Sequence, residues 1–208
     1  MAVDWSVIEK LEGKGIKKAY VPLPDTSWSG VTVASGVDLG QQTEASLASL
    51  CLSPALYAKL KPYLGHKKQA AVEFLKTKPL ILTDEEVHEL DTAIRKRFLK
   101  EVSQAYGPNW DKLSDAMQTV LMSVSYQYGV GLAKKCPKFY GACRANDPQA
   151  VIAELRNFGD KYGKRRNQEA DYLEAANTKV TAAMPAQEAS NGPWVLLWRL
   201  IRGIIQSN

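Results

Sequence analysis

Residues 30–40 read GVTVASGVDLG, and this stretch decides the fold of the N-terminal part of the chain. Three β-forming residues, VTV, run into small residues and glycines that surround a single acid, Asp38. The turn-prone letters PDTSWSG come just before, and the strand-like letters YVPL precede those. The region from about 19 to 40 therefore predicts a small β-lobe. If the two valines face a core, Thr32 faces the opposite side, where it and Asp38 can meet across the turn.

A different pattern begins after residue 40, where apolar residues recur at helical spacing. This pattern predicts a larger helical lobe over about 43–182. Its clearest helix start is the sequence LTDEE, in which Thr83 caps the helix and Glu86 completes a capping box. We expect that helix to continue toward Ala105.

Each end of the chain predicts one further helix. Apolar residues recur at three-residue steps from Trp5 to Leu11 behind a potential N-cap, Asp4, which predicts a short amphipathic helix. The letters GPWVLLWRLIRGIIQ predict an apolar helix over about 193–206, which is shorter than the ~20 residues that span a bilayer. We favour docking of this helix on the core, and contact with a membrane surface stays open as an alternative. The chain is thus predicted to form a single α+β domain over 1–208, mostly helical.

The composition restricts the partners that the protein can have. The 208 residues include 27 lysines and arginines against 22 aspartates and glutamates, a formal net charge of +5. Hydrophobic residues at 45% and charged residues at 24% argue against a disordered chain. The positive balance favours anionic polymers. Basic residues are scattered, with only short runs such as Lys164-Arg165-Arg166, and solvated faces explain most of them. Because no groove-reading element stands out, nucleic acid is not an expected partner.

Cysteine spacing and the N-terminus bear on the compartment. Cys51, Cys136 and Cys143 lack the spacing of a zinc site and lie far from both histidines, so we predict no metal site. Cys136 and Cys143 can form a disulfide in an oxidising compartment. The odd number of cysteines is equally consistent with reduced thiols, and we favour the reduced state at synthesis. The letters MAVDWSVIEKLEGKG lack the segments of a secretory signal, so we expect synthesis in the cytoplasm and delivery by another route.

Glu12 is the first candidate for acid–base chemistry. It follows Ile8 by four residues and Trp5 by seven, which places its carboxyl on the apolar face of the short helix. Partial desolvation there favours the protonated form that a general acid needs. The alternative is a frayed helix end beside Gly13 that leaves the carboxyl in water. The helical periodicity does not distinguish these two environments of the Glu12 carboxyl.

Asp38 is the second candidate. Glycoside hydrolysis requires two carboxyl groups in different surroundings, because one protonates the leaving oxygen and the other activates water. From the residues alone, the simpler interpretation is that Asp38 caps the helix after Gly40 or accepts hydrogen bonds from turn amides. Asp25, in PDTS, also lies where a turn favours aspartate.

Several segments together resemble a known family. An early helix ending in Leu-Glu-Gly, a tyrosine a few residues later, the GVTVASG segment and a long helical lobe resemble the phage-type lysozymes. GVTVASGVDLGQ is most similar to the pesticin-like branch of bacterial muramidase toxins. LTDEEVHELDTAIRKRFLKEV resembles the family's linking helix, and LSDAMQTVLMSVSYQYGVG resembles its central buried helix. The resemblance covers most of the chain and implies a lysozyme-like fold with an active-site cleft between the β-lobe and the helical lobe.

The resemblance also implies residue roles. Glu12 corresponds to the general acid, and Thr32 corresponds to a threonine that helps position the water. The second carboxylate is either Asp38, six residues after the threonine as in the pesticin-like branch, or Asp25, before the threonine as in the T-even phage lysozymes. We favour Asp38 because GVT, ASG and DLG match as a block. Three more residues are expected near the cleft: Tyr20, Tyr126 and Gln127. For the second of them, Tyr126, a role in the core is equally open.

The implied activity is hydrolysis of the β-1,4 bond between N-acetylmuramic acid and N-acetylglucosamine in peptidoglycan, with inversion and without a metal or organic cofactor. Inversion requires carboxyl groups ~6.5–9.5 Å apart. We expect a monomer that acts in the periplasm or on the cell wall, as a phage endolysin, a secreted toxin or an injected effector, and that an immunity protein can inhibit. Two alternatives stay open: a catalytically silent peptidoglycan-binding module, and a membrane-active antibacterial protein that acts through its C-terminal helix.

Overall fold

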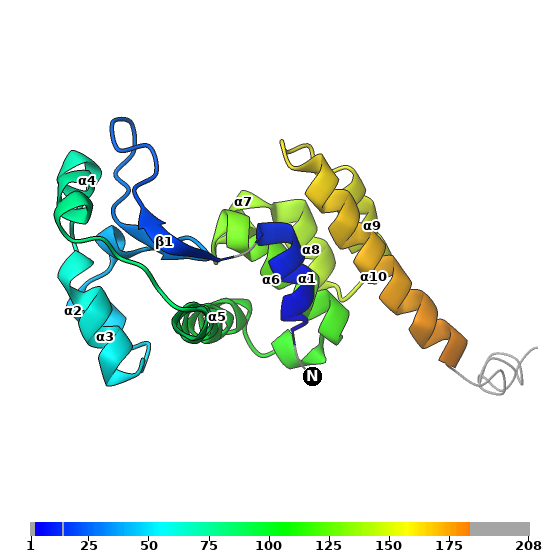
Figure 1. The fold of residues 1–208 in the computed structure, drawn as a ribbon. Helices are drawn as coiled ribbons and strands as arrows, with labels where there is room; N and C mark the ends of the chain where they lie inside the picture. Colours follow the sequence, from blue (N-terminus) through cyan, green and yellow to red (C-terminus); the bar gives the residue numbers. More distant parts are fainter. Residues whose placement is uncertain (1–2, 14, 184–208) are drawn as a thin grey trace, which may run out of the picture. The chain divides into compact units, whose positions relative to one another are not determined.

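A computed structural model describes residues 3–13 and 15–183, drawn as a ribbon in Figure 1. The described part is α+β and mostly helical, as predicted. Two compact units divide the chain after residue 135. That the whole chain acts as one catalytic domain stays a prediction. The elements of the first unit are α1 (Trp5–Glu12), β1 (Ile16–Tyr20), β2 (Thr32–Ala34), β3 (Val37–Asp38), η1 (Leu39–Gln41), α2 (Glu44–Ala48), α3 (Pro54–Leu60), η2 (Lys61–Tyr63), α4 (Lys68–Thr77), α5 (Asp84–Tyr106), η3 (Trp110–Lys112), α6 (Asp115–Tyr128) and α7 (Leu132–Lys135).

The sheet of the first unit places three of the candidate residues in one row. Its strands are antiparallel in the order β1-β2-β3, with Tyr20 opposite Thr32 and Thr32 opposite Asp38. Directly opposed residues of an antiparallel pair project from the same face of the sheet. The predicted approach of Thr32 to Asp38 across the turn is therefore confirmed, and it takes the form of strand pairing.

The first strand lies earlier than the prediction placed it. β1 covers IKKAY, so only the tyrosine of the letters YVPL belongs to a strand. Pro22 and Pro24 follow at once, and proline has no backbone N–H to donate to a strand ladder. The other edge of β1 is hydrogen-bonded to the segment before α5: the backbone N–H of Ala19 donates to the carbonyl oxygen of Leu80 (3.0 Å).

The two ends of the stretch 30–40 touch each other. A Cβ atom added to Gly30 would lie 2.5 Å from the Cα of Gly40, and a Cβ added to Gly40 would lie 2.6 Å from the Cα of Gly30. Real Cβ atoms do not approach another backbone this closely, so both positions need glycine. The contact closes the loop that contains β2 and β3 and fixes the place of Asp38.

Helix α5 connects the parts of the first unit. It begins with the predicted capping box, in which the N–H of Glu86 donates to Oγ1 of Thr83 (3.2 Å) and the N–H of Thr83 donates to Oε2 of Glu86 (2.8 Å). Along its length α5 contacts β1, β2 and α6. Figure 1 shows it between the sheet with α2 to α4 on one side and α1 with α6 on the other.

Helix α6 forms the centre of the helical part of this unit. Every residue from Ala116 to Ser125 is buried, which confirms the predicted central buried helix. Helix α1 packs against it, and the backbone N–H of Asp4 donates to Oγ1 of Thr119 (2.9 Å). This packing fixes the C-terminal end of α1, where Glu12 lies.

The second unit contains α8 (Pro137–Arg144), α9 (Pro148–Arg156) and α10 (Gly163–Ala183), and α9 packs against both neighbours. Part of the basic run 164–166 is an exception to the solvated faces expected for most basic residues. Arg166 is 1% exposed, its Nε donates to Oδ2 of Asp160 (3.0 Å), and its Nη1 pairs with Glu169. Arg165 donates to the same glutamate (3.1 Å). Paired carboxylates are what allow an arginine to be buried.

Two further expectations concern the cysteines and the tail. Cys51, Cys136 and Cys143 all fall within the described residues, and none forms a disulfide. The first is exposed and the other two are buried; burial raises the pKa of the Cys143 thiol to about 12. The predicted helix over 193–206 lies outside the described residues. Among the helices that are described, none is long and apolar enough to cross a membrane.

Candidate active site

Glu12 and Asp38 line one hollow of about 450 Å³ in the first unit. Glu12 comes from the end of α1 and Asp38 from β3, while Tyr126 of α6 and Arg97 of α5 contribute further walls. We call this the Glu12–Asp38 hollow. Four elements that are distant in the sequence thus form one concave surface, and two of them place a carboxyl group on it; a pair of carboxyl groups can act as acid and base in the hydrolysis of a glycosidic bond.

Glu12 is the last residue of α1 and is exposed. Of the two interpretations left open by the sequence, the structure has the one in which Glu12 is an exposed residue at the helix end beside Gly13. The helix ends there because Gly13 adopts a φ of +88°, which is accessible to glycine, and its N–H still donates to the carbonyl oxygen of Glu9. The apolar face of α1 is carried by Ile8, which is buried. The predicted periodicity was correct, but α1 ends at Glu12, and the residue is exposed.

Tyr126 provides the apolar part of the wall. Its ring makes edge contacts with Phe98 (centroids 4.8 Å apart) and Trp5 (6.3 Å apart). Burial raises the pKa of Tyr126 to about 12; the negative charges of Glu12 and Asp91 act in the same direction, and Arg95 opposes them. The phenol is therefore neutral at physiological pH and can donate a hydrogen bond into the hollow. Both a cleft role and a core role, which the sequence left as alternatives, describe this residue.

Asp38 is held by backbone amides. Its Oδ1 accepts hydrogen bonds from the N–H of Gly30 (3.0 Å) and of Gly40 (2.9 Å), the second of which caps η1. Of the two roles expected from the residues alone, the structure has the bonds to turn amides; the helix after Gly40, α2, is capped by Thr43. The side chain of Asp38 also lines the hollow. Because these amides bind Oδ1 most closely, Oδ2 keeps acceptor capacity for a further ligand. The two amide hydrogen bonds orient the carboxylate, and Oδ2 can still accept a hydrogen bond from a water or a ligand.

Thr32 lies next to Asp38 but does not line the hollow. The residue is 3% exposed, and its hydroxyl donates to the carbonyl oxygen of Gly30 (3.1 Å). The peptide groups on both sides of Gly30 are therefore bonded to the two candidates, the carbonyl to Thr32 and the N–H to Asp38. The structure indicates that Thr32 acts on the geometry of Asp38 through this glycine.

The remaining candidates lie outside the Glu12–Asp38 hollow. Asp25 is in the exposed loop after β1, where its Oδ1 accepts from Nε2 of Gln69 (2.5 Å). Tyr20 is 39% exposed on β1 opposite Thr32. Gln127 follows Tyr126 on α6 but is not among the residues that line the hollow. Of the two choices for a second carboxylate, only Asp38 shares a hollow with Glu12.

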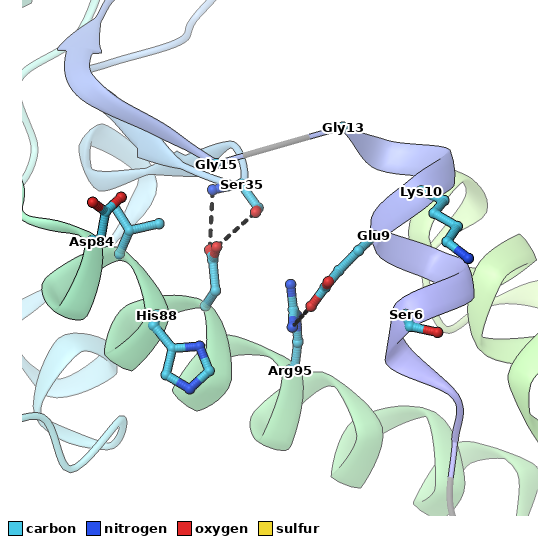
Figure 2. A pocket seen from close by; sticks show the side chains of 11 residues that line it. Ser6, Glu9, Lys10, Gly13, Gly15, Ser35, Asp84, His88 and Arg95 are labelled. Atoms are coloured by element: carbon cyan, nitrogen blue, oxygen red, sulfur yellow. Dashed lines mark hydrogen bonds and ion pairs between the residues drawn. The ribbon is translucent and has the colours of Figure 1, made fainter.

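The sequence missed a second polar cluster on the neighbouring face of α5. Figure 2 shows this hollow of about 490 Å³, lined by Glu9, His88 and Arg95, in which Arg95 pairs with Glu9 (2.5 Å). Ser35, from the turn between β2 and β3, is hydrogen-bonded there to Asp91. We call this the Glu9–His88 hollow.

A sequence signal for Asp91 did exist. It lies four residues after Val87 and three before Ile94, on the face that α5 turns to the core, and an acid on such a face is buried only when it is bonded. Among the described residues, no group of histidine, cysteine, aspartate and glutamate side chains could hold a metal ion.

Comparison with known proteins agrees with this architecture. Residues 2–149 match the model of the family described as "Pesticin: Bacterial toxin homologue of phage lysozyme, C-term". The matched range contains Glu12, Thr32 and Asp38 and all elements of the first unit. No curated protein matches the sequence.

Proposed function

Because the chain belongs to the pesticin family of bacterial toxin homologues of phage lysozyme, we propose that it is a muramidase. Its substrate would be peptidoglycan, and the reaction hydrolysis of the β-1,4 bond between N-acetylmuramic acid and N-acetylglucosamine. The observation that carries the proposal is that Glu12 and Asp38, from different elements, line one hollow. Both positions agree with those that the resemblance implies.

Glu12 is the proposed general acid. Glu12 is exposed and lines the hollow, so a sugar bound there can bring its leaving glycosidic oxygen within reach of this carboxyl. In the proposed reaction the carboxyl gives its proton to that oxygen as the glycosidic bond breaks. The neutral Tyr126 beside it offers a hydrogen-bond donor and an apolar surface for the sugar.

Asp38 is the proposed base. Two amides fix its Oδ1, so that Oδ2 can accept a proton from an attacking water without rearrangement of the side chain. Attack from the face opposite to the leaving group inverts the anomeric carbon, and it requires carboxyl groups ~6.5–9.5 Å apart. Thr32 keeps Gly30, and therefore Asp38, in position.

The biological setting follows from the substrate. Peptidoglycan lies outside the cytoplasmic membrane, so we propose that the protein acts in the periplasm or on the cell wall after release or delivery, with a bacteriolytic effect. An immunity protein that covers the Glu12–Asp38 hollow would protect the producing cell.

The test is digestion of purified peptidoglycan followed by analysis of the products. A muramidase leaves N-acetylmuramic acid at the new reducing ends, and inversion gives the α-anomer first, which proton NMR detects before mutarotation. Glu12→Gln should release no product while it still binds the polymer. Reducing-end N-acetylglucosamine, or equal products from wild type and Glu12→Gln, would refute the proposal.

A further inference from the structure

Trp28 lies on the surface in an environment that is unusual for its residue type. It is 69% exposed, whereas the other two described tryptophans, Trp5 and Trp110, are half-buried and buried. A large aromatic surface in water is unfavourable for folding, and such surfaces commonly mark binding sites. Trp28 lies in the loop between β1 and β2.

A lysine is held against the indole ring. The Nζ of Lys68 lies 3.9 Å from the ring centroid, which is a cation–π contact. Lys68 adopts a φ of +57°, a conformation that is uncommon outside glycine, and its N–H donates to the carbonyl oxygen of Ser29 (2.9 Å). Residues in this backbone region cost energy and cluster at ligand-binding sites. The strained backbone places the ammonium beside Trp28.

The loop that carries Trp28 is preorganised by its own hydrogen bonds. The hydroxyl oxygen of Ser27 lies 2.9 Å from the carbonyl oxygens of Pro22 and Leu23 and 2.9 Å from the hydroxyl of Ser29. A fixed loop loses little conformational entropy when a ligand binds, so the exposed ring can contribute most of its contact energy to affinity.

This loop is also joined to the Glu12–Asp38 hollow. Gln41, which lines the hollow, donates from Nε2 to the carbonyl oxygen of Trp28 (2.6 Å). Two residues after Trp28, the N–H of Gly30 donates to Asp38. Two residues of chain span at most ~7 Å, so the backbone of Trp28 lies near Gly30, whose N–H binds the carboxylate proposed as the base.

We propose that Trp28 and Lys68 form a saccharide subsite at the β-lobe end of the Glu12–Asp38 hollow. The indole face stacks on the C–H bonds of a sugar ring, whose partial positive charge suits the negative face of the ring. The Lys68 ammonium binds a carboxylate of the peptide attached to the same glycan strand. The subsite rests on the proposed function, because it assigns a part of the same polymer to residues outside the two carboxyl groups.

The test measures binding to purified peptidoglycan sacculi in the Glu12→Gln background, so that the polymer stays intact. Trp28→Ala should weaken binding about tenfold, which corresponds to ~1.4 kcal/mol. Leu23→Ala is the matched control, because Leu23 is 70% exposed in the same loop, and it should leave binding unchanged. Lys68→Met should weaken binding to sacculi but not to glycan strands from which an amidase has removed the peptides.

A kinetic measurement locates the subsite. With Glu12 intact, Trp28→Ala should raise KM more for long glycan strands than for the shortest oligomer that is cleaved, since only long strands reach the loop. If Trp28→Ala in the Glu12→Gln background binds sacculi as tightly as Glu12→Gln alone while wild type still digests them, the subsite is overturned but the proposed function is not. The Trp28 face would then be a candidate site for a protein partner. Failure of wild type both to bind and to digest sacculi would overturn the proposed function, and the subsite with it.

Discussion

The carboxylate of Asp91 binds both polar groups of Ser35. Oδ1 accepts from the Ser35 N–H (3.0 Å) and Oδ2 from its hydroxyl (2.7 Å), and Asp91 is only 7% exposed. Ser35 lies in the turn between Thr32 and Asp38, next to Ala34, whose φ is +54°. A buried acid on α5 thus holds the turn that connects two of the residues proposed for catalysis.

Asp91→Ala should therefore lower both stability and turnover. It removes two hydrogen bonds to a charged group and leaves the Ser35 N–H without its partner, at a cost of about 1.5–3 kcal/mol in the free energy of unfolding. Asp91→Asn keeps an acceptor for the N–H and offers a donor to the hydroxyl, so it should retain most of the stability. Urea unfolding and the rate of sacculus digestion check this; an alanine variant as stable as the asparagine variant would show that the contact is unimportant.

Gly40→Ala should disturb Asp38 from the other side. The added Cβ meets the Cα of Gly30, and relief of this overlap moves the two amides that orient the carboxylate, with a cost of about 1–3 kcal/mol for the overpacking alone. Gly141→Ala is the control, since a Cβ there meets nothing within 4 Å and lies inside a helix, where alanine gains about 1 kcal/mol over glycine. If both variants keep full activity and stability, the Gly30–Gly40 contact does not position Asp38.

Asp38→Asn and Asp25→Asn should differ in activity. Asp38 lines the hollow shared with Glu12, so loss of its charge should reduce turnover by about 10²–10⁴-fold, a range typical of general acid–base catalysis. Asp25→Asn should retain activity, because Asp25 lies in an exposed loop bonded to Gln69. The rate of product release from peptidoglycan measures the activity of both variants. A defect confined to Asp25→Asn would transfer the role of the base to Asp25.

Features that depend on local sequence were predictable. The capping box of Thr83 and Glu86 needs only residues three apart, and it was found where expected. The order VTV, turn, VD likewise led to the pairing of Thr32 with Asp38. These features follow from turn chemistry and from the two-residue period of a strand.

Features that depend on how segments pack were not predictable in the same way. The exposure of Glu12 depends on where α1 ends, and the burial of Arg166 depends on how α10 packs, although its partners Asp160 and Glu169 lie only six and three residues away. The contact of Gly30 with Gly40 requires the whole loop to close. Local propensity contains no information on such packing, so the sequence left these features open.

Alkaline pH should destabilise the protein. The pKa values of Tyr126 and Cys143 are raised by burial to about 12, from ordinary values of 10.0 and 9.0. The unfolded chain therefore loses these protons first, so their stabilising contribution is complete below pH 9 and is lost as the pH rises toward 12. Each group lowers the free energy of unfolding by up to about 1.4 kcal/mol per pH unit, between its pKa in the unfolded chain and its pKa in the folded protein. Urea midpoints from pH 8 to 11 measure this; Cys143→Ala should flatten the profile above pH 9, and Cys51→Ala, at an exposed site, should not.

The buried pair in the second unit should be sensitive to removal of one partner. The side chains of Arg166 and Glu169 are each 1% exposed, so Glu169→Gln removes one carboxylate from a buried guanidinium that also pairs with Asp160, at a cost of about 3–5 kcal/mol. The double variant Arg166→Met with Glu169→Leu should recover part of this loss, because apolar side chains of similar volume avoid the desolvation of two charges, whereas Arg165 and Asp160 each lose one bond. Arg156→Ala is the control: its partners Asp171 and Glu174 are exposed, and exposed ion pairs contribute little to stability. Thermal unfolding should rank Glu169→Gln as the least stable of the three, and equal losses for Glu169→Gln and Arg156→Ala would mean that burial of this pair does not govern the stability of the unit.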